Sequence, residues 1–356
     1  MEKTSPPSPW QCSRWAMTDA QWASARAACA AVIYPEGLPS GDVDDVTPGW
    51  TDATMPEHWS AWCSSVDRWT VAAPGGRSGG TPVYLYHCHP VATRVHKCML
   101  FLCGHEQPPV YWTTNYVDND GSSLIGAFLL AGWDVVIADM PARGFNPAVQ
   151  QIVIGGVLTT VNIHAYAPLD ADSGPSAYRM FTEHLVLATN RILATMAPTQ
   201  FVIAGHSGGA QTVPIIGVVD SRASIIVAME GSLPQSAMIY PFTDAPSANL
   251  YGAINEYESY TAGPLFLAAP QADYGALTAM AAAVPGRTTL VCCSLYDSNF
   301  TLGSVAALRS YYARLAACLP ASCALRLIEQ EYWAGSKGGQ HDMSPAAVAE
   351  IASLIL

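Results

Sequence analysis

Ser207 lies in the part of this chain whose residue types and spacing most clearly suggest chemistry. It is the centre of Gly205-His206-Ser207-Gly208-Gly209, which has the form G-x-S-x-G. The apolar run Phe201–Ala204 predicts a buried strand before it, and the residues Ala210–Ile216 predict a helix after it. A serine on a tight strand-to-helix turn projects its hydroxyl from the sheet edge, and flanking glycines leave room where the turn closes. The pattern therefore predicts that Ser207 is a catalytic nucleophile.

A base and an acid should accompany this serine, because a hydroxyl is a weak nucleophile until a base removes its proton. His341 is the best candidate for the base, since it follows the last predicted strand in a glycine-rich loop. Asp297 is the best candidate for the acid that orients the histidine, because it follows the predicted strand Thr289–Ser294. Glu230, at the end of the preceding strand, is the alternative acid. The chain order Ser207, Asp297, His341 is the one expected with such a turn.

Other polar residues have weaker claims to a place in this site. His206 lies inside the turn, with its side chain expected to point elsewhere, and His164 and His184 are expected at the surface. Asp139 ends another predicted strand, and we interpret it as part of a turn that anchors the edge of the sheet.

Acyl transfer would also need hydrogen-bond donors for a developing oxyanion. The backbone N–H of Gly208, directly after the nucleophile, is one candidate. The second donor is expected from the loop after the strand Met99–Cys103, where a glycine lets the backbone bend. The N–H groups of His105 and Glu106 both remain candidates for it.

His87 and His89 lie on the same face of a predicted strand. Two such histidines need further ligands at matching positions to bind a metal. The sequence shows no neighbouring set of aspartate and histidine that would supply them. No metal site is therefore expected.

The elements that position these residues alternate between strands and helices from Pro82 onward. Predicted strands are Val83–His87, Cys98–Cys103, Asp134–Ala138, Phe201–Ala204, Ser224–Met229, Thr289–Ser294 and Leu325–Gln330. Predicted helices are Thr18–Val32, Ser122–Ala131, Pro175–Met196, Thr301–Cys318 and Pro345–Leu354. Several strands are continuously apolar, as in a parallel sheet covered on both faces. The order predicts a mostly parallel, doubly wound α/β sheet.

Two segments do not follow this alternation of strands and helices. Residues 1–80 contain seven of the ten tryptophans and form a predicted N-terminal extension to a catalytic domain, 81–356. We expect this extension to bury its indoles against the main domain; the alternative is an aromatic surface for sugars or for a partner subunit in a homo-oligomer. Residues 232–286 are rich in tyrosine and are predicted to be an inserted lid.

Composition excludes several classes of partner. The formal net charge of −12 would repel nucleic acid. No apolar run reaches the length of about 18 residues that a membrane span needs. The first residues lack the basic and then apolar pattern of a signal peptide.

With the turn at Ser207, the Gly104-His105-Glu106 loop, and Asp297 and His341 in this order, the chain resembles the α/β-hydrolase superfamily over about residues 80–356. The resemblance implies a Ser-His-Asp mechanism without a cofactor. It does not imply a substrate, because the fold hosts many activities. We expect a serine esterase acting on a small-molecule or glycan ester. The alternatives are a peptidase or amidase of the same fold, and a binding protein without catalysis.

Overall fold

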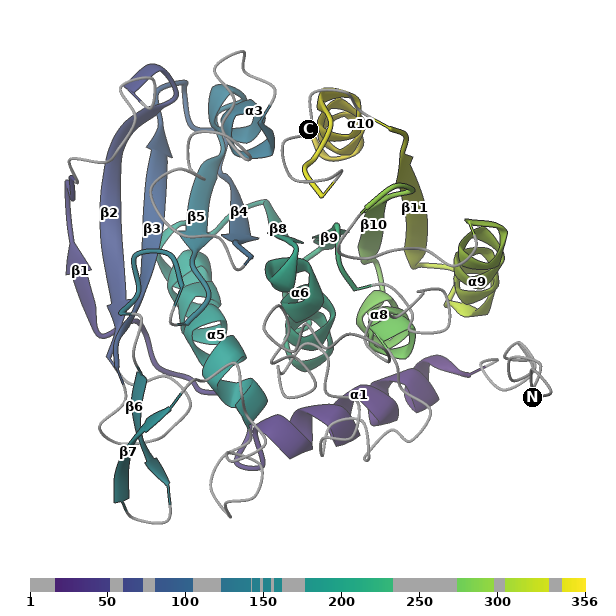
Figure 1. Ribbon diagram of the computed structural model, residues 1–356, viewed down its shortest axis with the longest axis horizontal. Coiled ribbons are helices and arrows are strands. Elements are labelled where there is room, and N and C mark those ends of the chain that lie inside the picture. The colour runs from purple at the N-terminus through teal and green to yellow at the C-terminus, as the bar shows by residue number, and fades with distance from the viewer. Residues whose placement is uncertain are drawn as a thin grey trace, which may run out of the picture.

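The computed structural model describes residues 17–51, 60–72, 81–104, 123–141, 143–147, 150–154, 157–161, 177–232, 274–297, 305–332 and 341–356. In these residues a nine-stranded sheet runs in the order β1-β2-β3-β5-β4-β8-β9-β10-β11 (Figure 1). Its strands are β1 (Asp45–Thr47), β2 (Cys63–Val71), β3 (Val83–Pro90), β4 (Lys97–Leu102), β5 (Asp134–Ala138), β8 (Gln200–His206), β9 (Ile225–Met229), β10 (Thr288–Ser294) and β11 (Ala324–Gln330). A separate antiparallel hairpin is formed by β6 (Gln150–Ile154) and β7 (Val157–Val161).

The sheet changes from antiparallel to parallel along its width. The strands β1, β2, β3 and β5 pair antiparallel, whereas every pair from β5 to β11 is parallel. The carboxyl ends of the parallel strands therefore meet at one edge, where ligands of open α/β sheets bind. This confirms the predicted, mostly parallel sheet.

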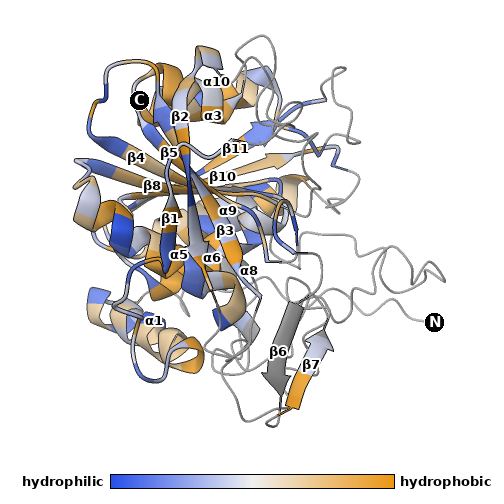
Figure 2. Cartoon of the chain, turned by 90° about the vertical axis from the view of Figure 1, so that its left-hand side faces the viewer, coloured by the Kyte–Doolittle hydropathy of each residue, from blue (hydrophilic) through white to orange (hydrophobic). Residues whose placement is uncertain are grey.

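Helices cover both faces of the sheet (Figure 1). The helices are α1 (Asp19–Ile33), α3 (Leu124–Leu130), α5 (Ala177–Thr195), α6 (Gly208–Val219), α8 (Tyr274–Ala282), α9 (Val305–Cys318) and α10 (Pro345–Ile355). One apolar layer joins alternate strand residues such as Leu100 and Ile203 to α1, α5, α6, α8 and α9. The other joins their neighbours Met99 and Val202 to α3 and α10. Figure 2 shows this hydrophobic character along the central strands. None of the helices in the described part combines the length and apolar character of a membrane span.

The described part of residues 1–80 is integral to this architecture. Helix α1 begins with a capping box at Thr18 and packs against α6, and β2 pairs with β3 along its length. Trp22, Trp62 and Trp69 are buried, in agreement with indoles that pack against the main domain. Neither β1 nor β2 was among the predicted strands.

The predicted lid, 232–286, lies largely outside the described residues. Its last part forms α8, which packs against α6 and so belongs to the covering layer of the sheet. Just after α8, the guanidinium of Arg287 is buried and donates hydrogen bonds to backbone carbonyls of α6, of α8 and of the connection that follows α6. Arg287 therefore joins these two helices through their backbones.

Candidate active site

Ser207 lies on a sharp turn between β8 and α6 at the carboxyl edge of the parallel strands. Its backbone has φ 54° and ψ −122°, a conformation that costs energy for a residue with a side chain. A Cβ on Gly205 would lie 2.5 Å from the carbonyl oxygen of Gly209. A Cβ on Gly209 would lie 2.2 Å from the carbonyl oxygen of Leu102. The two glycines are therefore required by close backbone approach at the turn.

The side chains of Ser207, His341 and Asp297 form a hydrogen-bonded chain. Nε2 of His341 lies 2.8 Å from Oγ of Ser207. Nδ1 of the same ring lies 2.8 Å from Oδ2 of Asp297, which follows β10 and is buried. With Nδ1–H donated to the carboxylate, the lone pair of Nε2 faces the serine hydroxyl. The arrangement can accept the serine proton and stabilise the imidazolium that results.

Two further side chains fix the loop that carries His341. The buried His206 ring donates from Nε2 to the backbone carbonyl of His341 over 2.8 Å. Gln330, at the end of β11, donates to the carbonyl of Asp342 over 2.6 Å and accepts from the N–H of Ser344 over 2.5 Å. As predicted, His206 points away from the serine, but its supporting contact could not be read from the sequence. The only sequence signal for it is its place beside Ser207.

Glu230, the alternative acid, lies beside Asp297. It follows β9, is buried, and has a positive φ of 53°. Its Oε2 accepts the backbone N–H of Ser294 over 2.7 Å. Burial, reinforced by the negative charge of Asp297, raises the pKa of Glu230 well above its ordinary value. A raised pKa favours the neutral form of Glu230, and Asp297 is the carboxylate within hydrogen-bond distance of the His341 ring, so the geometry favours Asp297 as the partner of His341.

The N-terminus of α6 points its backbone donors at this region. Gly208 is the first residue of α6, and the first N–H groups of a helix have no partner within it and carry partial positive charge. Strand β4 ends beside the turn, because the carbonyls of Leu102 and Cys103 face Gly209. The two candidates for the second oxyanion donor, His105 and Glu106, lie outside the described residues, so their role stays a prediction.

A small pocket adjoins the turn on the side of β5. It is lined by Leu102, Cys103, Ala138, Asp139, Met140, Pro141, Phe181, His184, Leu185, Gly209 and Thr212. The expectation that His184 lies at the surface was wrong, because α5 packs it against the sheet at 2% exposure. Burial lowers the pKa of this ring to about 3, so it is neutral. The Asp139 carboxylate accepts the N–H of Phe145 over 2.9 Å, which agrees with its predicted role in a turn. His164 lies outside the described residues.

A second group of polar side chains has the spacing of metal ligands. One donor atom each of Asp67, His87 and His89 lies within 4.8 Å of the other two. Asp134 contacts both rings. The expectation that the two histidines lack further ligands was therefore wrong. The missing carboxylates come from neighbouring strands rather than from nearby positions in the chain.

Comparison with known proteins identifies the fold. No protein-family model and no curated protein sequence matches the chain. Among solved structures, methylesterase BT1017 superposes with a TM-score of 0.60 at 16% identity, over 94% of this chain and 62% of the other. Acetyl xylan esterase 1 from Thermoanaerobacterium sp. superposes with a TM-score of 0.54 at 15% identity, over 99% of this chain and 94% of the other. A glucuronoyl esterase from Teredinibacter turnerae superposes with a TM-score of 0.55 at 13% identity, over 97% of this chain and 85% of the other.

These similarities show that the chain has the α/β-hydrolase fold, which confirms the fold expected from the sequence. At sequence identities of 13–16%, these similarities are evidence for the fold alone. The chain also spans only 62% of the length of the methylesterase.

Proposed function

We propose that this protein is a serine hydrolase that cleaves carboxylic esters through an acyl-enzyme intermediate. The observation that carries the proposal is the hydrogen-bonded chain from Ser207 through His341 to Asp297, with 2.8 Å at each step. Nucleophile and base within hydrogen-bond reach, with the base oriented by a third group, is the geometric signature of covalent catalysis by serine.

In this mechanism Ser207 Oγ attacks the ester carbonyl while Nε2 of His341 takes its proton. Asp297 keeps the proton of His341 on Nδ1 and stabilises the cation. The N–H of Gly208 binds the oxyanion, together with a donor from His105 or Glu106. His341 then returns the proton to the departing alcohol. Water, activated by His341, attacks the acyl-enzyme and releases the acid.

For the substrate we propose a neutral ester on a glycan or a small molecule. The segment 232–286 contains four acidic residues and no Lys or Arg, which disfavours anionic acyl groups. Solved structures with a similar fold include a methylesterase, an acetyl xylan esterase and a glucuronoyl esterase. These names support an ester bond on a carbohydrate as the first class to test.

The test is a panel of p-nitrophenyl esters of rising acyl length, run beside acetylated xylan. We expect hydrolysis of short acyl esters and release of acetate from xylan. Ser207→Ala should reduce both to background while its far-UV spectrum and unfolding midpoint stay unchanged. A fluorophosphonate should label the wild type at one site and leave Ser207→Ala unlabelled.

Three results would contradict the proposal. Full esterase activity of Ser207→Ala would move the chemistry elsewhere. Cleavage of aminoacyl amides without cleavage of esters would make the protein an amidase. Failure to react with the fluorophosphonate, with the fold intact, would indicate a protein that binds its ligand without catalysis.

A further inference from the structure

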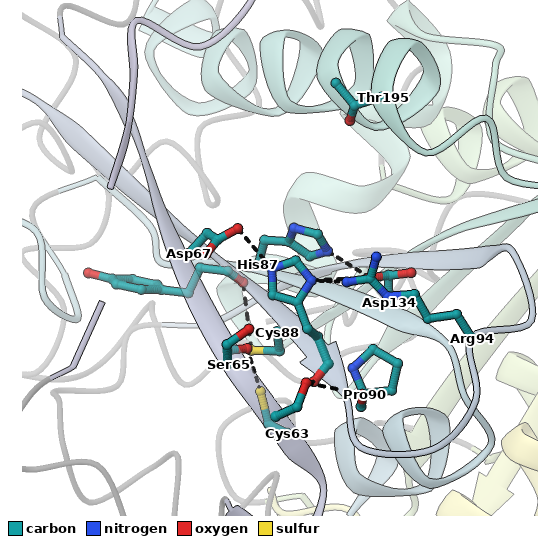
Figure 3. Close-up of polar contacts among 12 residues, drawn as sticks. Cys63, Ser65, Asp67, His87, Cys88, Pro90, Arg94, Asp134 and Thr195 are labelled. Carbon is teal, nitrogen blue, oxygen red and sulfur yellow. Dashed lines mark hydrogen bonds and ion pairs between the residues drawn. The ribbon is translucent and has the colours of Figure 1, made fainter. Parts of the chain in front are cut away.

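Four polar residues gather at the edge of the sheet opposite to Ser207, on three neighbouring strands. Asp67 on β2 pairs directly with His87 on β3. Asp134 begins β5, and the pairing of Cys88 with Val135 brings it beside His89. All four side chains lie on the face covered by α5, and Figure 3 shows Asp134 and Arg94 on one side of the imidazole rings and Asp67 on the other.

The contacts within the group define which ring nitrogens hold protons. Nε2 of His89 lies 2.8 Å from Oδ2 of Asp67, so its proton is on Nε2 and its lone pair is on Nδ1. Nδ1 of His89 lies 3.8 Å from Oδ1 of Asp134. Nε2 of His87 lies 2.8 Å from the same oxygen. Oδ1 of Asp134 therefore lies near one nitrogen of each ring, and the centroids of the two rings lie 3.9 Å apart.

A cation already contacts two of these groups, Asp134 and His89. Nη2 of Arg94 lies 3.4 Å from Oδ1 of Asp134 and also contacts Nδ1 of His89. The Arg94 side chain is 50% exposed, whereas that of Asp134 is 7% exposed. The guanidinium thus enters a buried anionic position from solvent and can leave it without disturbing the core.

We propose that this group is a binding site for Zn²⁺, with His87 Nε2, His89 Nδ1 and Asp134 Oδ1 as ligands and with Asp67 orienting His89. Zinc ligands of these types lie about 2.0–2.2 Å from the metal, which places tetrahedral donors about 3.3 Å apart. The separations from Asp134 Oδ1 to the two ring nitrogens, 2.8 and 3.8 Å, bracket this value. The hydrogen bond from His89 to Asp67 is the carboxylate–histidine contact that normally fixes a metal-binding ring.

Charge and protonation balance in this scheme. When the metal enters, Arg94 leaves, so one divalent cation neutralises the two carboxylates. The proton on Nε2 of His87 moves to Nδ1 of the same ring, which frees the Nε2 lone pair. The fourth tetrahedral position takes a water. Because the site lies across the sheet from Ser207, it joins β3 to β5 and takes no part in ester chemistry.

The test is calorimetric titration of the chelator-treated full chain with ZnCl₂, combined with thermal unfolding. We expect one Zn²⁺ per chain and a rise in Tm of a few degrees at saturation. His89→Ala and Asp134→Asn should abolish binding, and Asp67→Asn should weaken it by about 10–100-fold. Arg94→Ala should tighten it, because the competing cation is gone. His96→Ala, which removes an exposed histidine on the turn just before β4, is the matched control and should bind as the wild type does.

Arg94→Ala keeps the test informative if other variants misfold, because it removes only a half-exposed side chain and should increase the affinity for zinc. Absence of zinc binding in both the wild type and Arg94→Ala would overturn the proposal. Binding that survives in folded His89→Ala would overturn it as well. Loss in Asp67→Asn with retention in Asp134→Asn would overturn the ligand assignment. Zinc should leave the rate of p-nitrophenyl ester hydrolysis unchanged, so the site and the proposed esterase activity are tested separately.

Discussion

Asp297→Asn is the substitution that tests the proposed catalytic chain most sharply. In the wild type, the Asp297 carboxylate lies 2.8 Å from Nδ1 of His341. During attack by Ser207 the imidazole becomes a cation whose centre of charge lies roughly 4 Å from the carboxylate. At an effective dielectric constant of about 20, this attraction is worth about 4 kcal/mol, or about three decades in rate.

The amide adds a second effect. Its NH₂ group can donate to Nδ1 and so favour the tautomer with the proton on Nε2, where the ring cannot accept from Ser207. In a serine protease the same exchange costs about 10⁴ in kcat, so we expect Asp297→Asn to lower kcat/KM by about 10³–10⁴. Asparagine has nearly the same volume, so the fold should be retained.

Glu230→Gln is the matched control. Because Glu230 is buried and its pKa is raised well above its ordinary value, a neutral amide of the same shape should replace it with less than about a tenfold loss, or about 1.4 kcal/mol. The assay is the initial rate with p-nitrophenyl acetate, normalised to the fraction of chains that a fluorophosphonate labels. Near-normal activity of Asp297→Asn beside an inactive Glu230→Gln would refute the reasoning and assign the acid to Glu230.

Three further substitutions test the framework around the site. In Gly209→Ala the new Cβ would lie 2.2 Å from the carbonyl oxygen of Leu102, so we expect the free energy of unfolding measured in urea to fall by about 1–3 kcal/mol and activity to fall strongly. In the control Gly41→Ala the nearest atom lies 3.7 Å from the new Cβ, so neither property should change. Unchanged stability and activity in Gly209→Ala would refute the packing argument. Burial lowers the pKa of His184 to about 3, against about 6.5 in the unfolded chain, so the unfolded state binds more protons between these pH values and stability falls as the pH is lowered. Between pH 7.5 and pH 5, His184 should lower the free energy of unfolding of the wild type by about 2 kcal/mol, and His184→Gln should lack this loss. Equal pH dependence of the two proteins in urea unfolding would contradict the prediction. Arg287→Met should destabilise the fold by about 3–5 kcal/mol, because its guanidinium serves four buried backbone carbonyls; an unfolding midpoint within error of the wild type would count against this role.

The elements nearest to the nucleophile could be predicted from the sequence because their signals are local. The apolar run before Ser207 and the glycines around it mark a strand, a turn and a helix within a few residues. By contrast, β2 was missed, because its exposed and half-buried positions interrupt the apolar pattern. Without β2 there was no reason to place Asp67 beside His87, since that contact depends on the pairing of two strands.

The choice between Asp297 and Glu230 shows the same limit. Both follow strands of the predicted sheet, and the sequence favours Asp297 over Glu230 only by its place in the chain order. Their contacts in the structure distinguish them: Asp297 lies 2.8 Å from Nδ1 of His341, whereas Glu230 accepts the backbone N–H of Ser294 and has a pKa raised by burial. Such electrostatics depend on the packing of β9 against β10, and packing of this kind has no signature in a single sequence.

The outer strands of the sheet have a consequence for the behaviour of the protein at high concentration. An unpaired strand edge can template the addition of another chain, and short or charged edges oppose this. Here β1 has three residues. At the other border, β11 carries Arg326 and Glu329, which pair with Glu350 of α10 and Arg309 of α9. The two borders of the sheet should therefore resist polymerisation by strand addition, and the resistance at β11 should weaken in concentrated salt, where its ion pairs are screened.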